Sequence, residues 1–489
     1  MEAKPRVSPL PAWQRSDLPH APAFTVGNAV RVIGPGTVLL GVSLGAGDWL
    51  LGPAVIVKYG PSVLWLCTVS VILQALLNTE MARYTLATGE PIFTGFMRTA
   101  PGARFWGWGY SLLHLAQVGW PGWALAAGSA LAALFLGRMP RGEDHLVVLA
   151  LGYLIFLGSV SVVLLGERVQ RLVDGMEWIM MGWMVIFLCA VDVAFVPWPA
   201  WTQVAEGFVG PLFGGAAIPA DVDWLLLAAF AAYSGAGGTI NATLTHWLRD
   251  KGFGMAGTVV LTPTAIGGQR IPLARTGAVF EPTESNMAKW REWWRYLRAD
   301  LCYLWTTGCL IGMGLPALLA FQYLPGWTPM GGDGAGAVLA QALGQRHPIL
   351  WVLALLTGFW ILFSTQLGIT AGFARSVTDI LWTSSAGGGR GRAGALYRGA
   401  LVAFTAAGAV AITLAEPLAL ILIGANLAAV NFALLAFHTL WVNRTLLPRE
   451  LRPPLWRQAA LVACGLFFGG LACAALGSDP THLLAPFGR

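Results

Sequence analysis

Two short stretches of this chain combine glycines with polar side chains inside long apolar runs. Residues 43–49 read Ser-Leu-Gly-Ala-Gly-Asp-Trp, and residues 233–241 read Tyr-Ser-Gly-Ala-Gly-Gly-Thr-Ile-Asn. Glycine lowers helix stability and frees the backbone. The carboxylate of Asp48 costs on the order of 2–4 kcal/mol or more at the middle of a bilayer unless it is compensated. Because paired Gly-interrupted membrane segments are typical of transporter sites, we expect the two stretches to face each other around a substrate.

The expected substrate-binding residues surround one carboxylate with backbone groups and neutral side chains. They are Gly45, Ala46, Gly47, Asp48, Ser234, Gly237, Gly238, Thr239, Asn241, Gln366 and Thr370. Carbonyls at one end of a broken helix favour a cation, whereas free N–H groups at the other end favour a carboxylate. Asp48 is the candidate metal ligand, and it could also act as the N-cap of the second half-helix. Ser234, Thr239 and Asn241 have the alternative role of local caps or helix–helix hydrogen bonds.

A second group of residues is expected to couple or gate transport. It consists of His114, Gln117, Glu80, Arg83 and Arg375. A histidine in a membrane span is either a proton carrier or a packed, hydrogen-bonded side chain. Glu80 with Arg83, and Arg375 with Asp379, have the spacing of ion pairs on one helix face. These two pairs are therefore predicted at the ends of their spans.

The composition predicts a polytopic helical membrane protein. Of the 489 residues, 56% are hydrophobic and 11% are charged, and the apolar runs do not alternate as barrel strands do. The six cysteines lack metal-ligand or redox spacing and are expected to be core residues. No catalytic triad, phosphate loop or metalloprotease motif occurs, so neither an enzyme nor a cofactor is predicted. The predicted spans are 33–58, 62–84, 105–136, 146–165, 176–197, 223–247, 300–323, 348–374, 396–415, 417–441 and 456–476.

The positions of the basic residues predict how these spans are oriented. With the N-terminus in the cytoplasm and the C-terminus outside, cytoplasmic segments contain all but five of the 30 Lys and Arg residues. A nucleic-acid-binding face would not alternate with the spans in this way, so no nucleic-acid partner is expected. The exceptions are Lys58, Arg138, Arg141, Arg346 and Arg489.

The spans divide into two halves of five, and an odd number of spans per half inverts the second half. We expect a cytoplasmic tail (1–31), spans 1–5 as a first repeat (32–198), an external loop (199–222), spans 6–10 as a second repeat (223–443), and span 11 with the C-terminal end (444–489). The long cytoplasmic loop 248–299 ends in a basic, aromatic segment, which predicts an interfacial helix.

Several short motifs stand at a spacing that is typical of one family. In the first three spans they are Gly34-Pro35-Gly36, the stretch 45–49, Lys58-Tyr59-Gly60, Leu64-Trp65, Ala82-Arg83 and Thr88-Gly89, and in span 8 they are Ser364-Thr365 and Ala371-Gly372-Phe373. With these motifs the chain resembles the Nramp family of divalent-metal transporters, most specifically near the N-terminus. This resemblance implies the LeuT-type fold, an all-α inverted repeat of five plus five helices with helices 1 and 6 broken, followed by an eleventh helix.

The chain departs from the family at the metal-binding motifs. The family has Asp-Pro-Gly-Asn where Gly45-Ala46-Gly47-Asp48 stands here, and the family's Met-Pro-His of span 6 is missing from 235–241. Without the methionine, a preference for softer transition metals is weakened. The acidic residues that the family places in span 3 for protons are absent between His114 and Ala133.

These patterns favour a secondary-active symporter that works by alternating access and moves a divalent cation, with a hard ion such as magnesium or manganese preferred. The alternative substrate is a small organic solute such as an amino acid or a carboxylate, with metal binding lost. A sensor or scaffold is the third interpretation. We expect the protein in the plasma (inner) membrane of a bacterium, with the lipid bilayer as its other partner, and the sequence does not indicate an oligomeric state.

Overall fold

The computed structural model describes residues 10–45, 47–165, 167–214, 218–219, 221–259, 262–266, 269–274, 276–324, 335–385 and 390–478. Within these residues, nine helices are long and apolar enough to cross a membrane, and the shorter apolar helices Ile179–Phe195 and Trp224–Tyr233 complete the set. These segments match the eleven predicted spans. The prediction of an all-α polytopic membrane protein is therefore confirmed.

The described residues of the first half of the chain form helices α1 to α9 and one π-helical turn. They are α1 (Val26–Val32), α2 (Pro35–Ser43), the π-helical turn η1 (Gly47–Leu51), α3 (Gly52–Tyr59), α4 (Trp65–Thr88), α5 (Ile92–Met97), α6 (Ala103–Val118), α7 (Gly122–Leu136), α8 (His145–Leu164) and α9 (Glu167–Phe195).

The second half is longer and contains the 248–299 loop. Its helices are α10 (Trp198–Gly214), α11 (Trp224–Tyr233), α12 (Thr239–Asp250), α13 (Glu284–Leu297), the π-helical segment η5 (Arg298–Trp305), α14 (Thr306–Tyr323), α15 (Ala335–Gly344), α16 (Pro348–Ser384), α17 (Arg390–Ala411), α18 (Pro417–Thr445) and α19 (Leu455–Gly477).

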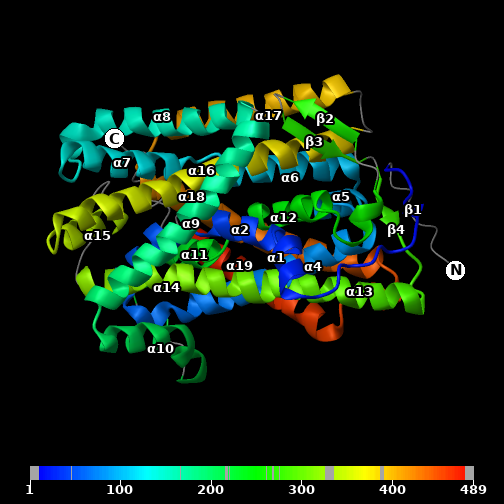
Figure 1. Cartoon of the computed structure of the whole chain (residues 1–489), viewed down its shortest axis with the longest axis horizontal. Coiled ribbons are helices and arrows are strands. Elements are labelled where there is room, and N and C mark those ends of the chain that lie inside the picture. Colours follow the sequence, from blue (N-terminus) through cyan, green and yellow to red (C-terminus); the bar gives the residue numbers. More distant parts are fainter. Residues whose placement is uncertain are drawn as a thin grey trace.

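Most helices run along the long axis of the molecule, with α8 and α17 at one edge and α10 at the opposite edge (Figure 1). The 37-residue helix α16 contacts α2, α6, α7, α8 and α17, and so lies against both halves of the bundle. The outer faces carry apolar side chains, and Phe135, Ile186 and Leu466 are 71%, 68% and 65% exposed. Such outward apolar faces are expected where lipid rather than water is the solvent.

Spans 1 and 6 are both interrupted at the predicted glycines. Span 1 stops as a helix at Ser43 and resumes in η1 at Gly47, and span 6 stops at Tyr233 and resumes at Thr239. Gly237 and Gly238 have φ angles of +91° and +50°, a region that glycine enters at little cost. The local sequence therefore explains the second break directly.

Span 3 is also divided, into α6 and α7, at the Trp120-Pro121-Gly122 turn. Proline lacks the N–H that would continue the helix, which accounts for the interruption. The region predicted as an external loop, 199–222, contains the helix α10, which packs against α4 and α14.

The N-terminal segment and the 248–299 loop fold together on one side of the bundle. Strand β1 (Gln14–Arg15) pairs in parallel with β4 (Ala278–Val279), and β2 (Thr262–Ile266) forms an antiparallel hairpin with β3 (Gln269–Leu273). A helix, α13, lies where the interfacial helix was predicted; it buries Trp290 and Trp293 and continues through η5 into α14, and its place at the membrane interface stays a prediction. Its position relative to the bundle is visible in Figure 1.

Candidate functional site

The two breaks touch each other inside the bundle. A Cβ atom on Gly47 would overlap the carbonyl oxygen of Tyr233, the last residue of α11, and a Cβ on Gly45 would overlap the hydroxyl of Thr365 in α16. Only glycine leaves room for these approaches. Gly47 therefore lies against the second break, Gly45 lies against α16, and Ala46 lies outside the described residues.

Asp48 is buried at the first break without an internal countercharge. Its side chain lies in η1, only 4% of it is exposed, and Oδ1 has no hydrogen-bond partner. Within the described residues, no ion pair includes Asp48. Oδ2 faces Gly312 of α14, and the thiols of Cys67 and Cys309 lie within its electrostatic range. A buried, unpaired carboxylate is costly, so this group calls for a cation or a proton.

Gln117 of α6 supplies the polar contacts of the second break. Its Nε2 donates to the carbonyl of Gly237 at 2.9 Å, and its Oε1 accepts from the N–H and the hydroxyl of Thr239 at 3.0 and 2.9 Å. The same Oε1 accepts from Nδ2 of Asn431 in α18 at 2.8 Å. One amide therefore satisfies the first N–H of α12, which helix geometry leaves without an intrahelical partner, and shares the Gly237 carbonyl with the N–H of Ile240. Gly238 packs beside this amide.

A polar face on α4 contacts the other side of the second break. Nδ2 of Asn241 donates to Oδ1 of Asn78 at 3.0 Å and to Oε1 of Gln74 at 3.3 Å. Nε2 of Gln74 donates to Ser70 at 3.0 Å and to the carbonyl of Ala232 at 3.4 Å, and the Ser70 hydroxyl donates to the carbonyl of Ala231. Sequence reasoning missed Ser70, Gln74 and Asn78, although their spacing of four marks one helix face.

The remaining predicted binding residues have local partners. The Ser234 hydroxyl donates to the carbonyl of Phe230 at 2.7 Å, one turn back in α11. Nε2 of Gln366 donates to Thr370 at 3.2 Å, and Ser159 of α8 lies 3.4 Å from the Thr370 hydroxyl. Within the described chain, neither Gln366 nor Thr370 forms a hydrogen bond with a residue of the two breaks.

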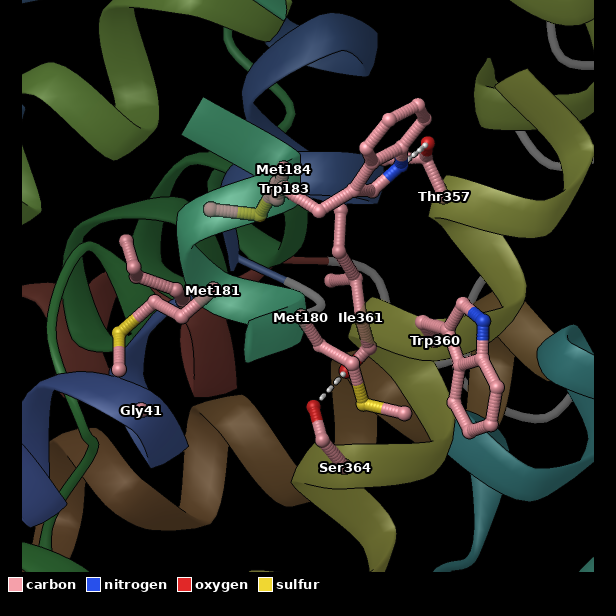
Figure 2. A pocket seen from close by; sticks show the side chains of 10 residues that line it. Gly41, Met180, Met181, Trp183, Met184, Thr357, Trp360, Ile361 and Ser364 are labelled. Atoms are coloured by element: carbon pink, nitrogen blue, oxygen red, sulfur yellow. Dashed lines mark hydrogen bonds between the residues drawn. The ribbon is translucent and has the colours of Figure 1, made fainter. Parts of the chain in front are cut away.

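A cavity of about 30 Å³ lies between α2, α9 and α16, directly beside the first break. Figure 2 shows that Trp183 and Thr357 point toward each other across it, joined by a 3.1 Å hydrogen bond from the indole N–H. The volume accommodates about two water molecules. The lining residues are Gly41, Leu44, Met180, Met181, Trp183, Met184, Thr357, Trp360, Ile361 and Ser364.

Charged side chains join α12 to α16 at the end of α12 that lies away from the break. Nη1 of Arg249 donates to both carboxylate oxygens of Asp379 at 3.0 Å, and Nε2 of His246 lies 3.0 Å from the same carboxylate. Arg375 pairs with Asp250 of α12. The predicted Arg375–Asp379 pair is thus replaced by contacts between the two helices, because tertiary packing offers Asp379 a closer guanidinium.

His114 lies near this charged cluster. It is 1% exposed, its ring packs edge-on against Phe373 at 5.2 Å between ring centres, and Nδ1 has no hydrogen-bond partner. It lies within electrostatic range of His246. Gln117, one turn further along α6, hydrogen-bonds to the second break instead. The two residues that the sequence grouped together therefore have different surroundings.

The predicted Glu80–Arg83 pair is present and extends to the last helix. Nε of Arg83 donates to Glu80 at 2.7 Å, and Nη1 of Arg457 in α19 donates to the same carboxylate at 2.8 Å. Nδ2 of Asn443 donates to the Glu80 backbone carbonyl at 2.9 Å, and both guanidiniums stack on Trp294 of α13. The pair therefore fastens α4 to α13, α18 and α19.

Asp300 is a further buried carboxylate that sequence reasoning missed. Its Oδ2 accepts from the N–H of Gly36 at 2.7 Å, and the ammonium of Lys251 lies close to Gly34. A carboxylate at the N-terminus of a helix is favourable, so Asp300 stabilises the start of α2. The signal in the sequence is a single acidic residue at the beginning of an apolar span.

No protein-family model matches the chain, and no curated protein matches it. Solved structures do resemble it. A crystal structure of a mutant Eremococcus coleocola manganese transporter superposes with a TM-score of 0.64 at 13% identity, covering 97% of this chain and 93% of that one. The same transporter in complex with an aromatic bis-isothiourea substituted compound gives 0.61 at 14% identity, with 96% and 92% covered.

A nucleobase-cation-symport-1 family transporter with bromovinylhydantoin bound gives a TM-score of 0.48 at 14% identity, covering 93% of this chain and 94% of that one. Identities this low show the fold alone. Together with the two broken helices, the likeness to the manganese transporter confirms the predicted LeuT-type fold.

Proposed function

We propose that this chain is a secondary transporter that binds a small cation at Asp48 and moves it across the membrane by alternating access. The observation that supports this most directly is the buried Asp48 carboxylate, which has an unpartnered oxygen and no ion pair with a described residue. It lies where two broken helices meet, and a broken helix provides carbonyl oxygens for a cation. A carboxylate in this position is functional by default in membrane proteins.

A hard divalent ion such as magnesium or manganese fits the surrounding donors best. Asp48 supplies a hard carboxylate oxygen, and a broken helix supplies backbone carbonyls, donors that suit ions which keep part of their water shell. Within the described residues, no group of three His, Cys, Asp or Glu side chains is arranged to hold a metal ion. Cys67 and Cys309 are near enough to influence Asp48 electrostatically, but they do not form such a group with it.

Alternating access requires contacts that close one end of the transport pathway and that break when this end opens. The ion pairs of Arg249 and His246 with Asp379 hold α12 against α16, and Asp300 holds the start of α2. Both half-helices, α2 and α12, begin or end at a break. We propose that these charged contacts form the inner gate and separate when the site opens on that side. His114, beside the cluster, is the proposed coupling residue.

The experiment is metal uptake into proteoliposomes, with Asp48→Asn compared with Asp192→Asn. Asp192 of α9 is the matched comparison because it is also buried with both carboxylate oxygens lacking partners, but it lies outside the two breaks. We expect Asp48→Asn to reduce manganese or magnesium uptake at least about tenfold, the factor that corresponds to about 1.4 kcal/mol. Asp192→Asn should stay near the wild type. Wild-type uptake by Asp48→Asn, or equal losses in both variants, would contradict the proposal.

A small organic solute is the second candidate, favoured by the apolar cavity of Figure 2. Three methionines and two tryptophans line it beside Leu44, and such side chains suit an apolar group better than an ion. Its present volume admits only water, so a solute would require the cavity to widen. A thermal-shift screen with metals and with amino and organic acids separates the two candidates. Stabilisation by an organic acid alone, without a metal response, would favour this second function.

A further inference from the structure

A groove at one end of α18 combines two arginines with a wall of apolar side chains. It has a volume of about 440 Å³ and opens to the outside of the molecule. We propose that it binds a phospholipid with an anionic headgroup, and this inference is independent of the transported substrate. The lining residues are Phe437, Leu440, Trp441, Arg444, Thr445 and Arg452.

The lining residues form one continuous face because of their spacing. Residues 437, 440, 441, 444 and 445 are three or four positions apart, so they follow one stripe of α18. Phe437 and Trp441 are each 43% exposed and precede Arg444 by about two turns and one turn. The face therefore changes from apolar to basic within about two turns, as a membrane-spanning helix does where hydrocarbon gives way to headgroups.

The positive charges of Arg444 and Arg452 are not balanced by an ion pair within the described residues. The segment from Arg444 to Arg457 contains four arginines and one acidic residue, Glu450. Arg457 is bonded to Glu80, which already bonds Arg83. Within the described residues, Arg444 and Arg452 form no ion pair, and Nε of Arg452 donates to the carbonyl of Leu447 at 3.0 Å. That bond orients the guanidinium and leaves its Nη groups for a ligand.

These features select a lipid rather than a free anion. Arginine matches phosphate oxygens through paired N–H donors. An indole ring and a phenyl ring on the adjoining turn supply a surface for an acyl chain, which inorganic phosphate does not have. Basic pockets between helices at the headgroup level are a recognised way of binding anionic lipids.

The test is native mass spectrometry of the full-length protein in neutral detergent, titrated with phosphatidylglycerol or with phosphatidylcholine. Arg444→Gln/Arg452→Gln removes both groove arginines. Arg392→Gln/Arg398→Gln, on α17, is the matched control because these two arginines are also exposed and the change in net charge is the same. We expect the groove variant to need about tenfold more phosphatidylglycerol for half-saturation, with the control variant within about twofold of the wild type.

A second variant tests whether the apolar side chains of the groove take part in binding the lipid. Trp441→Ala should weaken phosphatidylglycerol binding while leaving the two arginines in place. Glycerol phosphate, which carries the headgroup charge without acyl chains, should not compete. The proposal is overturned if the groove variant binds phosphatidylglycerol like the wild type, if the α17 control loses as much, or if phosphatidylcholine binds equally well. Competition by glycerol phosphate would also overturn it, since the site would then be a free-phosphate site.

Discussion

Replacing Gln117 by alanine tests whether one amide holds the second break together. The substitution leaves the N–H of Thr239 buried without a partner, whereas the carbonyl of Gly237 keeps the N–H of Ile240 at 3.1 Å. The unpaired N–H costs about 1–3 kcal/mol and the lost bond to the carbonyl about 1 kcal/mol, so the two together cost about 2–4 kcal/mol. The Thr239 hydroxyl can turn to another acceptor, and Asn431 keeps a 3.4 Å contact with the carbonyl of Leu113, so neither is added to this figure.

Gln366→Ala is the matched control for this substitution. Gln366 is also a fully buried glutamine in an apolar helix, but its side chain donates only to Thr370 of the same helix within the described chain. Truncation opens a similar cavity in both variants, while the polar loss at Gln366 is about 1 kcal/mol. The difference in Tm between the two variants therefore measures how much the contacts of Gln117 with the second break contribute to stability.

The assay is thermal unfolding of the purified protein at one fixed scan rate, because membrane proteins of this size often unfold irreversibly. Gln117→Ala should lower Tm clearly more than Gln366→Ala. Hydrogen exchange provides the local measurement, and the amide of Thr239 should lose its protection only in Gln117→Ala. Equal falls in Tm, with the Thr239 amide still protected, would refute the reasoning.

Two further predictions concern the first break and the region between spans 2 and 3. Gly47→Ala should lower both Tm and uptake, because the new methyl group meets the Tyr233 carbonyl, whereas Gly109→Ala should change neither, since nothing lies within 4 Å of the added atom. Burial alone would raise the pKa of Glu90, but the hydrogen bonds from Arg98 outweigh it and hold this pKa below its ordinary value. The stabilisation is therefore complete above the unfolded pKa of about 4.3 and is lost as the pH falls through the lower folded pKa. Glu90→Gln should flatten the fall of Tm between about pH 5 and pH 3, and an unchanged acid limb would count against the pair.

The two breaks could be predicted because their cause is local. Glycines and a carboxylate inside an apolar run are visible without any knowledge of the rest of the chain, and Gly237 and Gly238 have the positive φ angles that such residues allow. The length and spacing of the apolar runs likewise predicted the spans. In each case the physical preference belongs to a few neighbouring residues.

The partners of the breaks could not be predicted in the same way. Gln74 and Asn78 reach Asn241 across more than 160 positions, and that contact depends on how two helices pack. The ion pairs are a second case in which local spacing does not decide the partner. A spacing of four residues favoured Arg375 with Asp379, yet the folded chain presents Arg249 and His246 of another helix to that carboxylate. Local spacing indicates which pairs can form, and tertiary packing decides which do.

The polar groups of the breaks also determine the sign of the charge that the site attracts. Within the described residues, the side chains that hydrogen-bond across the second break are neutral amides and hydroxyls, those of Gln117, Gln74, Asn241 and Ser70 among them. The formal charge at the junction is therefore that of Asp48 when it is ionised. A cation or a proton neutralises this charge, whereas a carboxylate substrate would add a second negative charge in a medium of low dielectric constant. An anionic solute could bind here only together with a cation or a proton at Asp48, so loss of Asp48 should impair either candidate function.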